Sequence, residues 1–288
     1  MKKRENNFVE LGLRGRLNKN NKLNDLTGKE WLKFTKSWFI HRPPRRKDDE
    51  ILHPAKFPES LVEEFIKFFT KENGWVLDPF MGTGSTLISA AGVNRNSVGI
   101  ELSKNYFRSS SKRISKRKLG ELAFPINGDS LHLKELLFKN GFEKIKFDYT
   151  ITSPPYWNQL QRNSIRQKDR SAKGLDTKYS ENKNDIGNIS SYEEFLEKQA
   201  QVFDQVCDVT KQNGYLTIIT NNVYFEGRLY PLAYDTAISL TKRGEKSWVL
   251  KDEKIWLQDD KRLIALGVNN AWVGNRHHQY CLIFRKEK

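Results

Sequence analysis

A short apolar run ends in a glycine-containing turn at residues 75–84, WVLDPFMGTG. The run is typical of a buried β-strand, and Gly82 and Gly84 permit a tight turn that a ligand can approach closely. A helix is predicted next, from Ser85 to Ala91, and then a second buried strand at residues 98–101. This alternation of strands and helices indicates a mostly parallel sheet covered on both faces.

The rest of the chain continues the alternation. Further strands are predicted at residues 124–126, 147–151, 215–220, 248–256 and 279–284. Helices are predicted at residues 27–40, 59–69, 105–119, 131–138, 192–209 and 229–243. The first of these helices begins with a capping box, in which Thr27 precedes Glu30 by three positions. The sequence therefore predicts an α/β fold with a doubly wound sheet.

The length of 288 residues suits one large α/β domain with excursions. We expect its two parts at residues 51–157 and 191–288. Residues 1–50 form a basic N-terminal segment, and residues 158–190 form a basic, irregular insertion that is too long for an ordinary connection. A further polar loop is expected at residues 258–276. These three basic or polar segments lie outside the predicted sheet.

The formal net charge of +15 favours a polyanionic partner, and nucleic acid is the leading candidate. Simple solubility is the alternative reading of that charge. A membrane partner is not expected, because no apolar run approaches the roughly 18 residues that span a bilayer. Cys207 and Cys281 lack metal-type spacing, so neither a zinc site nor a disulfide framework is expected. The first residues lack the apolar core of an export signal, which favours the cytoplasm.

Polar residues follow several predicted strands, at the sheet edge where doubly wound folds bind ligands. Asp78 ends the first strand, Glu101 ends the next, and Asp129 follows the third. An acid at the position of Glu101 can accept hydrogen bonds from both ribose hydroxyls. The glycine pair lacks the third glycine of the dinucleotide fingerprint, and no Gly-Lys-Ser/Thr follows. Together with the acids it favours an adenosine-containing ligand over a purely structural turn.

A second strand end carries Ser153, Pro154, Pro155 and Tyr156. Prolines have no N–H, so this turn offers hydrogen-bond acceptors at fixed positions without competing donors. Such a site suits a planar group bearing an NH2, with Tyr156 as a stacking surface. The alternative to a binding site is a proline-rich turn with a purely structural role after a core strand.

Residues 77–84 and 152–157 resemble the cofactor loop and the catalytic motif of DNA amino-methyltransferases that use S-adenosylmethionine. Residues 53–69 are similar to the helix that precedes the family's cofactor loop. The similarity covers residues 27–157 well and the strands from 192 onward more loosely. The resemblance implies a Rossmann-like methyltransferase fold with S-adenosylmethionine as cofactor and no metal. The cofactor-binding residues that it implies are Phe57, Asp78, Phe80, Gly82, Gly84, Glu101 and Asp129.

The resemblance also implies a mechanism at Ser153, Pro154, Pro155 and Tyr156. The Ser153 side chain and the Pro154 carbonyl would accept the amine hydrogens, favour a pyramidal nitrogen and orient it for direct methyl transfer. Tyr156 would stack on a base flipped out of double-stranded DNA. Carbon methylation of cytosine would require a nucleophilic cysteine, and neither cysteine follows a proline.

In the family that the sequence resembles, serine at the position of Ser153 usually accompanies methylation of cytosine at N4, so the resemblance favours this target, with the N6 amine of adenine as the alternative. The cofactor loop precedes the catalytic motif, which departs from the permuted order common among serine-type enzymes. The resemblance implies a prokaryotic modification system, in which a cognate restriction endonuclease is a possible partner. RNA amino methylation and a non-catalytic nucleic-acid-binding module remain open as alternatives.

Contacts to DNA are expected from the segments outside the shared fold. The candidate regions are residues 1–50, 158–190 and 258–276, because Arg, Lys, Asn and Gln side chains can contact phosphates or base edges. The arginines singled out are Arg45, Arg46, Arg162, Arg166, Arg170 and Arg276.

Overall fold

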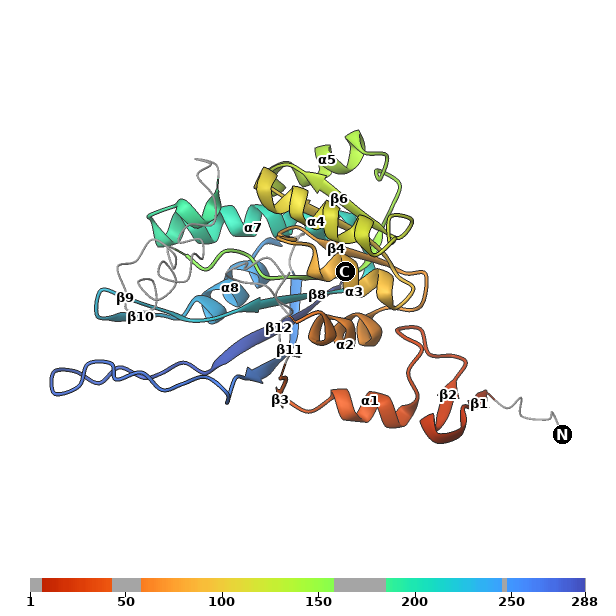
Figure 1. Cartoon of the computed structure of the whole chain (residues 1–288), viewed down its shortest axis with the longest axis horizontal. Helices are drawn as coiled ribbons and strands as arrows, with labels where there is room; N and C mark the ends of the chain where they lie inside the picture. The colour runs from red at the N-terminus through yellow and green to blue at the C-terminus, as the bar shows by residue number, and fades with distance from the viewer. Residues whose placement is uncertain (1–6, 43–57, 158–184, 245–247, 288) are drawn as a thin grey trace.

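The computed structural model describes residues 7–42, 58–157, 185–244 and 248–287, which form a large mixed sheet with helices on both faces (Figure 1). The eight strands lie in the order β3 (Trp38–Ile40), β11 (Trp248–Leu257), β12 (His278–Lys286), β8 (Thr210–Thr220), β7 (Phe147–Thr152), β4 (Trp75–Asp78), β5 (Asn96–Glu101) and β6 (Ala123–Asn127).

Strand β12 is antiparallel to its neighbours β11 and β8, whereas the other pairs in this sheet are parallel. From β4 the chain winds outward through β5 and β6 on one side, and then returns to build β7 and β8 on the other. The predicted doubly wound, Rossmann-like α/β fold is confirmed. The winding direction reverses between β4 and β7, which is where such sheets open a crevice for ligands.

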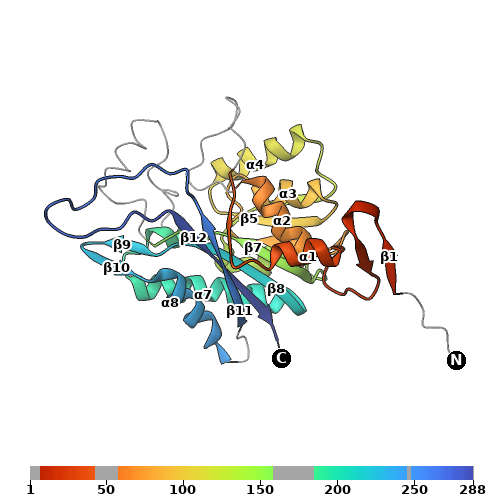
Figure 2. The ribbon, with the colours of Figure 1, turned by 90° about the horizontal axis from the view of Figure 1, so that it is seen from below.

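Helices cover the two faces of the sheet as separate layers (Figures 1 and 2). Helices α2 (Glu59–Phe69), α3 (Ser85–Gly92) and α4 (Lys104–Lys116) pack on one face. On the other face lie α5 (Leu133–Lys139), α7 (Tyr192–Val209) and α8 (Leu232–Thr241). The apolar positions of α2 recur at helical spacing and are all buried, as the sequence predicts.

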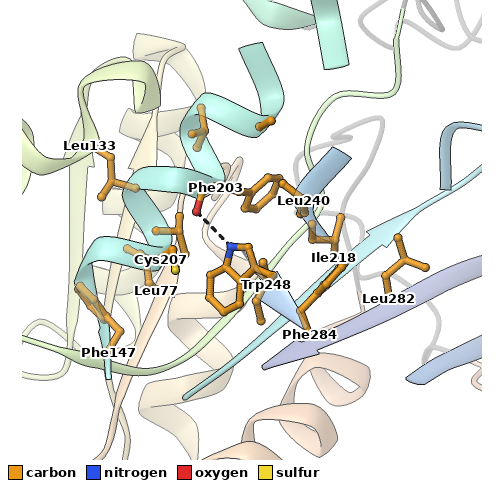
Figure 3. Packing of buried hydrophobic residues seen from close by; sticks show 14 of the residues in the cluster. Leu77, Leu133, Phe147, Phe203, Cys207, Ile218, Leu240, Trp248, Leu282 and Phe284 are labelled. Atoms are coloured by element: carbon orange, nitrogen blue, oxygen red, sulfur yellow. Dashed lines mark hydrogen bonds between the residues drawn. The ribbon is translucent and has the colours of Figure 1, made fainter. Parts of the chain in front are cut away.

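The core beneath α7 and α8 holds the central strands in place. Side chains of β4, β7 and β8, among them Leu77, Phe147 and Ile218, pack there against both helices (Figure 3). Trp248 of β11 is 1% exposed, and its indole N–H donates a 3.2 Å hydrogen bond to the carbonyl of Phe203 in α7. This packing therefore fixes the positions of β4, β7 and β8, and with them the polar residues that follow the ends of these strands.

The aromatic stretch that we predicted as one helix divides into a helix and a strand. Helix α1 (Gly28–Phe34) begins with the predicted capping box between Thr27 and Glu30. The prediction of helix through residue 40 is wrong, because residues 38–40 form β3 and pair with β11 at the sheet edge. The ammonium group of Lys254, on β11, donates to carbonyls at the end of α1 and at Lys36. Pairing with a distant strand overrides the local preference.

Several other boundaries differ from the predictions. Strand β8 starts at Thr210 instead of the predicted residue 215, because the strand continues through Asn213 at a φ of 65°. Helix α8 starts three residues late, because Arg228–Tyr230 forms a short strand, β10, paired with β9 (Val223–Phe225). A 3-10 turn, η2 (Ser130–His132), precedes α5.

A small hairpin of β1 (Phe8–Glu10) and β2 (Arg16–Asn18) lies beyond α1. Arg14, between these strands, makes two hydrogen bonds to the carboxylate of Glu30, which joins the hairpin to α1. Within the part of the chain that the structure describes, no helix is both long and apolar enough to cross a membrane.

Candidate active site

A pocket with a cavity volume of about 100 Å³ opens at the carboxyl ends of β4, β5 and β7. The predicted residues that line it are Asp78, Phe80, Gly82, Glu101, Asp129, Ser153, Pro154 and Pro155. Two motifs that lie far apart in the sequence, the 77–84 turn and the 152–157 segment, therefore share one cavity. Gly84 and Tyr156, which were also predicted, are not among the lining residues.

The glycine turn is shaped by backbone conformation and close packing. Gly82 and Gly84 have φ angles of 53° and 80°, a region that side chains disfavour. A Cβ atom on Gly84 would lie 2.9 Å from the Cβ of Ser110 in α4, which is too close for two carbon atoms. Gly84 therefore serves the packing of α3 against α4, while the backbone of Gly82 faces the pocket.

Glu101 fixes the turn from the neighbouring strand. Its carboxylate accepts a 2.9 Å hydrogen bond from the backbone N–H of Gly82 and a 2.7 Å bond from that of Ser103. Burial raises the pKa of Glu101 to about 7, although both backbone N–H groups favour the ionised form. Each carboxylate oxygen keeps a further lone pair, so the group can accept hydrogen bonds from a diol in the pocket.

Asp78 connects the two motifs. Its carboxylate accepts a 2.6 Å hydrogen bond from the Thr152 hydroxyl and a 3.0 Å bond from the backbone N–H of Phe80. The side chain is 3% exposed, and this burial raises its pKa to about 6 against the effect of its hydrogen bonds. One carboxylate thus holds the cofactor turn after β4 and the end of β7 in a single arrangement.

Two further acids border the pocket. Asp129 accepts a 2.9 Å hydrogen bond from the N–H of Leu131, and the neighbouring Ser130 hydroxyl donates to the carbonyl of Pro79. Asp185 is 6% exposed and accepts a 2.8 Å bond from the N–H of Gly187. Sequence reasoning missed Asp185, because it follows a long polar segment and no predicted strand positions it at the sheet edge.

The catalytic segment is anchored by a chain of polar contacts. The Ser153 hydroxyl donates to the Tyr156 hydroxyl at 3.2 Å, and that hydroxyl donates to the side-chain carbonyl of Gln279 at 3.2 Å. Sequence reasoning missed Gln279, because this contact joins residues that are 123 positions apart. Trp157 is buried beside Tyr156 and donates from its indole N–H to the Ser190 carbonyl at 3.1 Å.

A match to a family model covers residues 2–112 and 147–288 of the chain, and the model describes a DNA methylase family with N6 and N4 members. The chain belongs to this DNA methylase family. The match includes both motifs, the 77–84 turn and the 152–157 segment, and it confirms the predicted resemblance. Asp129 lies between the two matched ranges.

Several curated relatives of this chain are type II methyltransferases. The chain is 37% identical over 91 residues to the type II methyltransferase M.BglI of Bacillus subtilis, which covers 32% of this chain and 26% of the relative. With the type II methyltransferase M2.LlaDCHI of Lactococcus lactis subsp. cremoris it shares 41% identity over 64 residues, 22% of this chain and 24% of the relative. Each match thus spans about a quarter of the relative's length.

Among solved structures, TrmN from Thermus thermophilus aligns with 79% of this chain and 48% of its own chain, with 11% identity and a TM-score of 0.49.

Several residues singled out from the sequence lie outside the described part of the chain: Phe57, Arg45, Arg46, Arg162, Arg166 and Arg170. Arg276 is described, and its guanidinium lies 5.4 Å from the ring centroid of Tyr224. Among the described residues, no group of three or more His, Cys, Asp and Glu side chains is arranged to hold a metal.

Proposed function

We propose that this DNA methylase transfers a methyl group from S-adenosylmethionine to an exocyclic amine in double-stranded DNA. The observation that carries the proposal is the shared pocket of the glycine turn and the Ser-Pro-Pro-Tyr segment. A methyl donor and an amine acceptor must meet within bonding distance, and these two motifs supply one surface for each. Family membership supports the same assignment.

The residues present fit the cofactor. Glu101 has free carboxylate lone pairs for ribose hydroxyls, and Phe80 and Asp129 line the same cavity, where an adenine ring and its amino group would find an apolar and an acceptor surface. Phe57 is a further candidate from the sequence. When bound, S-adenosylmethionine would supply an electrophilic methyl group on a sulfonium sulfur. The cradle for it is the backbone of residues 79–83.

The roles of the catalytic segment follow from its hydrogen-bonding groups. Ser153 and the carbonyl of Pro154 would accept the two amine hydrogens, which withdraws the nitrogen lone pair from conjugation with the ring. Pro155 fixes the turn, and Tyr156 would present its ring to the flipped base. Methyl transfer would then proceed directly, without a covalent enzyme intermediate: an N–C bond would form as the C–S bond breaks, S-adenosylhomocysteine would leave, and the methylated amine would release one proton to water.

The target base that we favour is cytosine, methylated at N4, because position 153 is serine. The alternative is adenine, methylated at N6. Nucleoside analysis of DNA after incubation with the protein and cofactor separates the two. Recovery of N6-methyladenine alone would reject the inference from Ser153.

DNA contact is supported by charge and by the loop between β11 and β12. The chain carries a net charge of +15, and this loop projects from the sheet beside β9 and β10 (Figures 1 and 2). Its side chains include Trp272, which is 92% exposed, and Arg276 at its base. Strand β12 is antiparallel to both β11 and β8, so β11 runs in the same direction as β8 and β7. The loop that follows β11 therefore leaves the sheet at the edge that bears the pocket.

Incubation with radiolabelled cofactor and separate DNA and RNA pools tests the reaction itself. Label in DNA supports the proposal, and label in RNA alone would identify an RNA amino-methyltransferase. Cofactor binding without label in either pool would indicate a non-catalytic binding module. We also propose that the protein acts in the prokaryotic cytoplasm, on the nucleoid, within a modification system that can include a cognate restriction endonuclease.

A further inference from the structure

Three side chains from distant segments form a directed chain of hydrogen bonds beside the pocket. The Ser153 hydroxyl donates to Tyr156, and the Tyr156 hydroxyl donates to the Oε1 atom of Gln279, each over 3.2 Å. Tyr156 is 9% exposed, so its hydroxyl is largely shielded from water that could replace Gln279. The side-chain carbonyl of Gln279 therefore ends the chain with a pure acceptor.

The direction of this chain determines what Ser153 presents to the pocket. A serine hydroxyl has one proton and two lone pairs, and a free hydroxyl can rotate to donate or to accept. Because the proton of Ser153 is committed to Tyr156, its oxygen faces the pocket with lone pairs alone. An exocyclic NH2 group is a donor in the plane of the base, so it needs an acceptor here.

The sheet holds Gln279 in a defined place. Gln279 is directly opposite Trp256 in the β11–β12 ladder, and Trp256 is 5% exposed. On the other side of β12 the side-chain amide of Asn221 donates a 3.1 Å hydrogen bond to the carbonyl of His278. The β11 ladder and the Asn221 hydrogen bond thus fix the backbone on either side of Gln279, whose side chain lies beside Tyr156.

We propose that Gln279 is a positioning residue for methyl transfer, which acts through Tyr156 to hold Ser153 as a hydrogen-bond acceptor for the target amine. The inference rests on the proposed function. It assigns to a residue of β12 the control of which hydroxyl donates and which accepts in the catalytic segment. If the Gln279 amide were instead turned to donate, the order would reverse, and Ser153 would present a proton to a group that can only donate.

Two substitutions distinguish the effect of the Gln279 side-chain acceptor from the effect of the side chain's volume. Gln279→Met keeps the length of the side chain and removes the carbonyl, whereas Gln279→Glu keeps an acceptor at the same position. We expect Gln279→Met to lower kcat roughly tenfold to a hundredfold, because the Tyr156 hydroxyl loses this buried acceptor, with the Kd for S-adenosylmethionine unchanged. Gln279→Glu should restore most of the rate.

Gln201→Met is the matched control, because Gln201 lies in α7 and bonds to Glu197 and Lys198. It should leave kcat unchanged, and melting temperatures of all three variants check that they fold. A Gln279→Met enzyme with more than half of the wild-type kcat would overturn the proposal. So would a Gln279→Glu enzyme as slow as Gln279→Met.

Base discrimination supplies a second readout that does not depend on turnover. Oligo(dC) carries an amine where oligo(dU) carries a carbonyl, and oligo(dA) differs from oligo(dI) in the same way. With S-adenosylhomocysteine present, we expect the wild type to prefer the amino base of one pair, Gln279→Glu to keep this preference and Gln279→Met to lose it. If these preferences are found but no methyl group is transferred, the proposed function is refuted and the role of Gln279 in orienting Ser153 is supported. If methyl transfer occurs but Gln279→Met keeps the wild-type preference, the proposed function is supported and the role of Gln279 is refuted. A wild type without any preference would also refute the role of Gln279.

Discussion

The Thr152 hydroxyl donates a 2.6 Å hydrogen bond to the buried carboxylate of Asp78, and this bond joins the ends of β7 and β4. These two strands carry the catalytic segment and the glycine turn, and the sheet reverses its winding direction between them. The relative position of methyl donor and acceptor in the proposed reaction therefore depends on a contact that touches neither group. Its removal should affect both folding and catalysis.

Replacement of Thr152 by valine tests this contact. Valine keeps the shape but leaves the Asp78 carboxylate short of a donor, so we expect a loss of about 1–3 kcal/mol in the free energy of unfolding, measured in urea. Thr150→Val is the control, because the Thr150 hydroxyl is buried and has no hydrogen-bond partner within the described residues. That substitution should be neutral or stabilising. Equal losses in both variants would show that the bond to Asp78 contributes nothing specific.

The raised pKa of Glu101 predicts a pH-dependent cofactor affinity. Burial places this pKa at about 7, so the carboxylate gains a proton as the pH falls through neutrality and becomes a poorer acceptor for ribose hydroxyls. Calorimetry with S-adenosylmethionine should show affinity falling about threefold to tenfold from pH 8 to pH 6. Glu101→Gln should bind more weakly at pH 8 and show a flatter profile between pH 7 and pH 8. A wild-type profile that is flat over the whole range would contradict this role of Glu101.

Tyr156 should separate catalysis from cofactor binding. Tyr156→Ala removes the proposed stacking surface, worth about 1–3 kcal/mol per base, and should slow methyl transfer roughly tenfold to a hundredfold with nearly unchanged cofactor affinity. Tyr156→Phe keeps the ring and removes only the hydroxyl between Ser153 and Gln279. Comparison of the two in single-turnover assays divides the effect between stacking and hydrogen bonding. A cofactor affinity that falls as much as the rate would refute the stacking role.

Gly84 and Gly227 form a matched pair for backbone strain. Their φ angles are 80° and 78°, yet an added Cβ meets Ser110 at 2.9 Å in the first case and nothing within 4 Å in the second. Gly227→Ala should lower the free energy of unfolding by about 1–2 kcal/mol, the conformational term alone. Gly84→Ala should lower it further, by an amount that chemical denaturation measures. Similar losses would mean that α3 and α4 can move apart.

The loop between β11 and β12 should contribute to DNA binding through Trp272. We expect Trp272→Ala to weaken binding to duplex DNA about fivefold or more, because an exposed aromatic ring can stack on or insert between bases. The melting temperature should stay the same, since Trp272 is 92% exposed. Phe138→Ala, an exposed aromatic of α5 at 68%, serves as the control. Equal DNA affinity in both variants and the wild type would exclude this loop from the interface.

Local patterns in the sequence determined much of this protein. The apolar run and glycines of residues 75–84, the acids at strand ends and the proline-bounded segment after β7 each follow from the conformational limits of neighbouring residues. These patterns predicted the alternation of strands and helices, the edge of the sheet that bears the pocket and part of its lining. They need no knowledge of the rest of the chain.

Only the tertiary structure decided which distant residues complete the site and the sheet. Gln279 meets Tyr156 because β12 inserts antiparallel between β8 and β11, and Asp185 reaches the pocket from beyond an insertion. Residues 38–40 are a strand because β11 offers them a ladder. Such contacts depend on strand order and register, which are set by the packing of the whole core and leave no trace in the residues nearby.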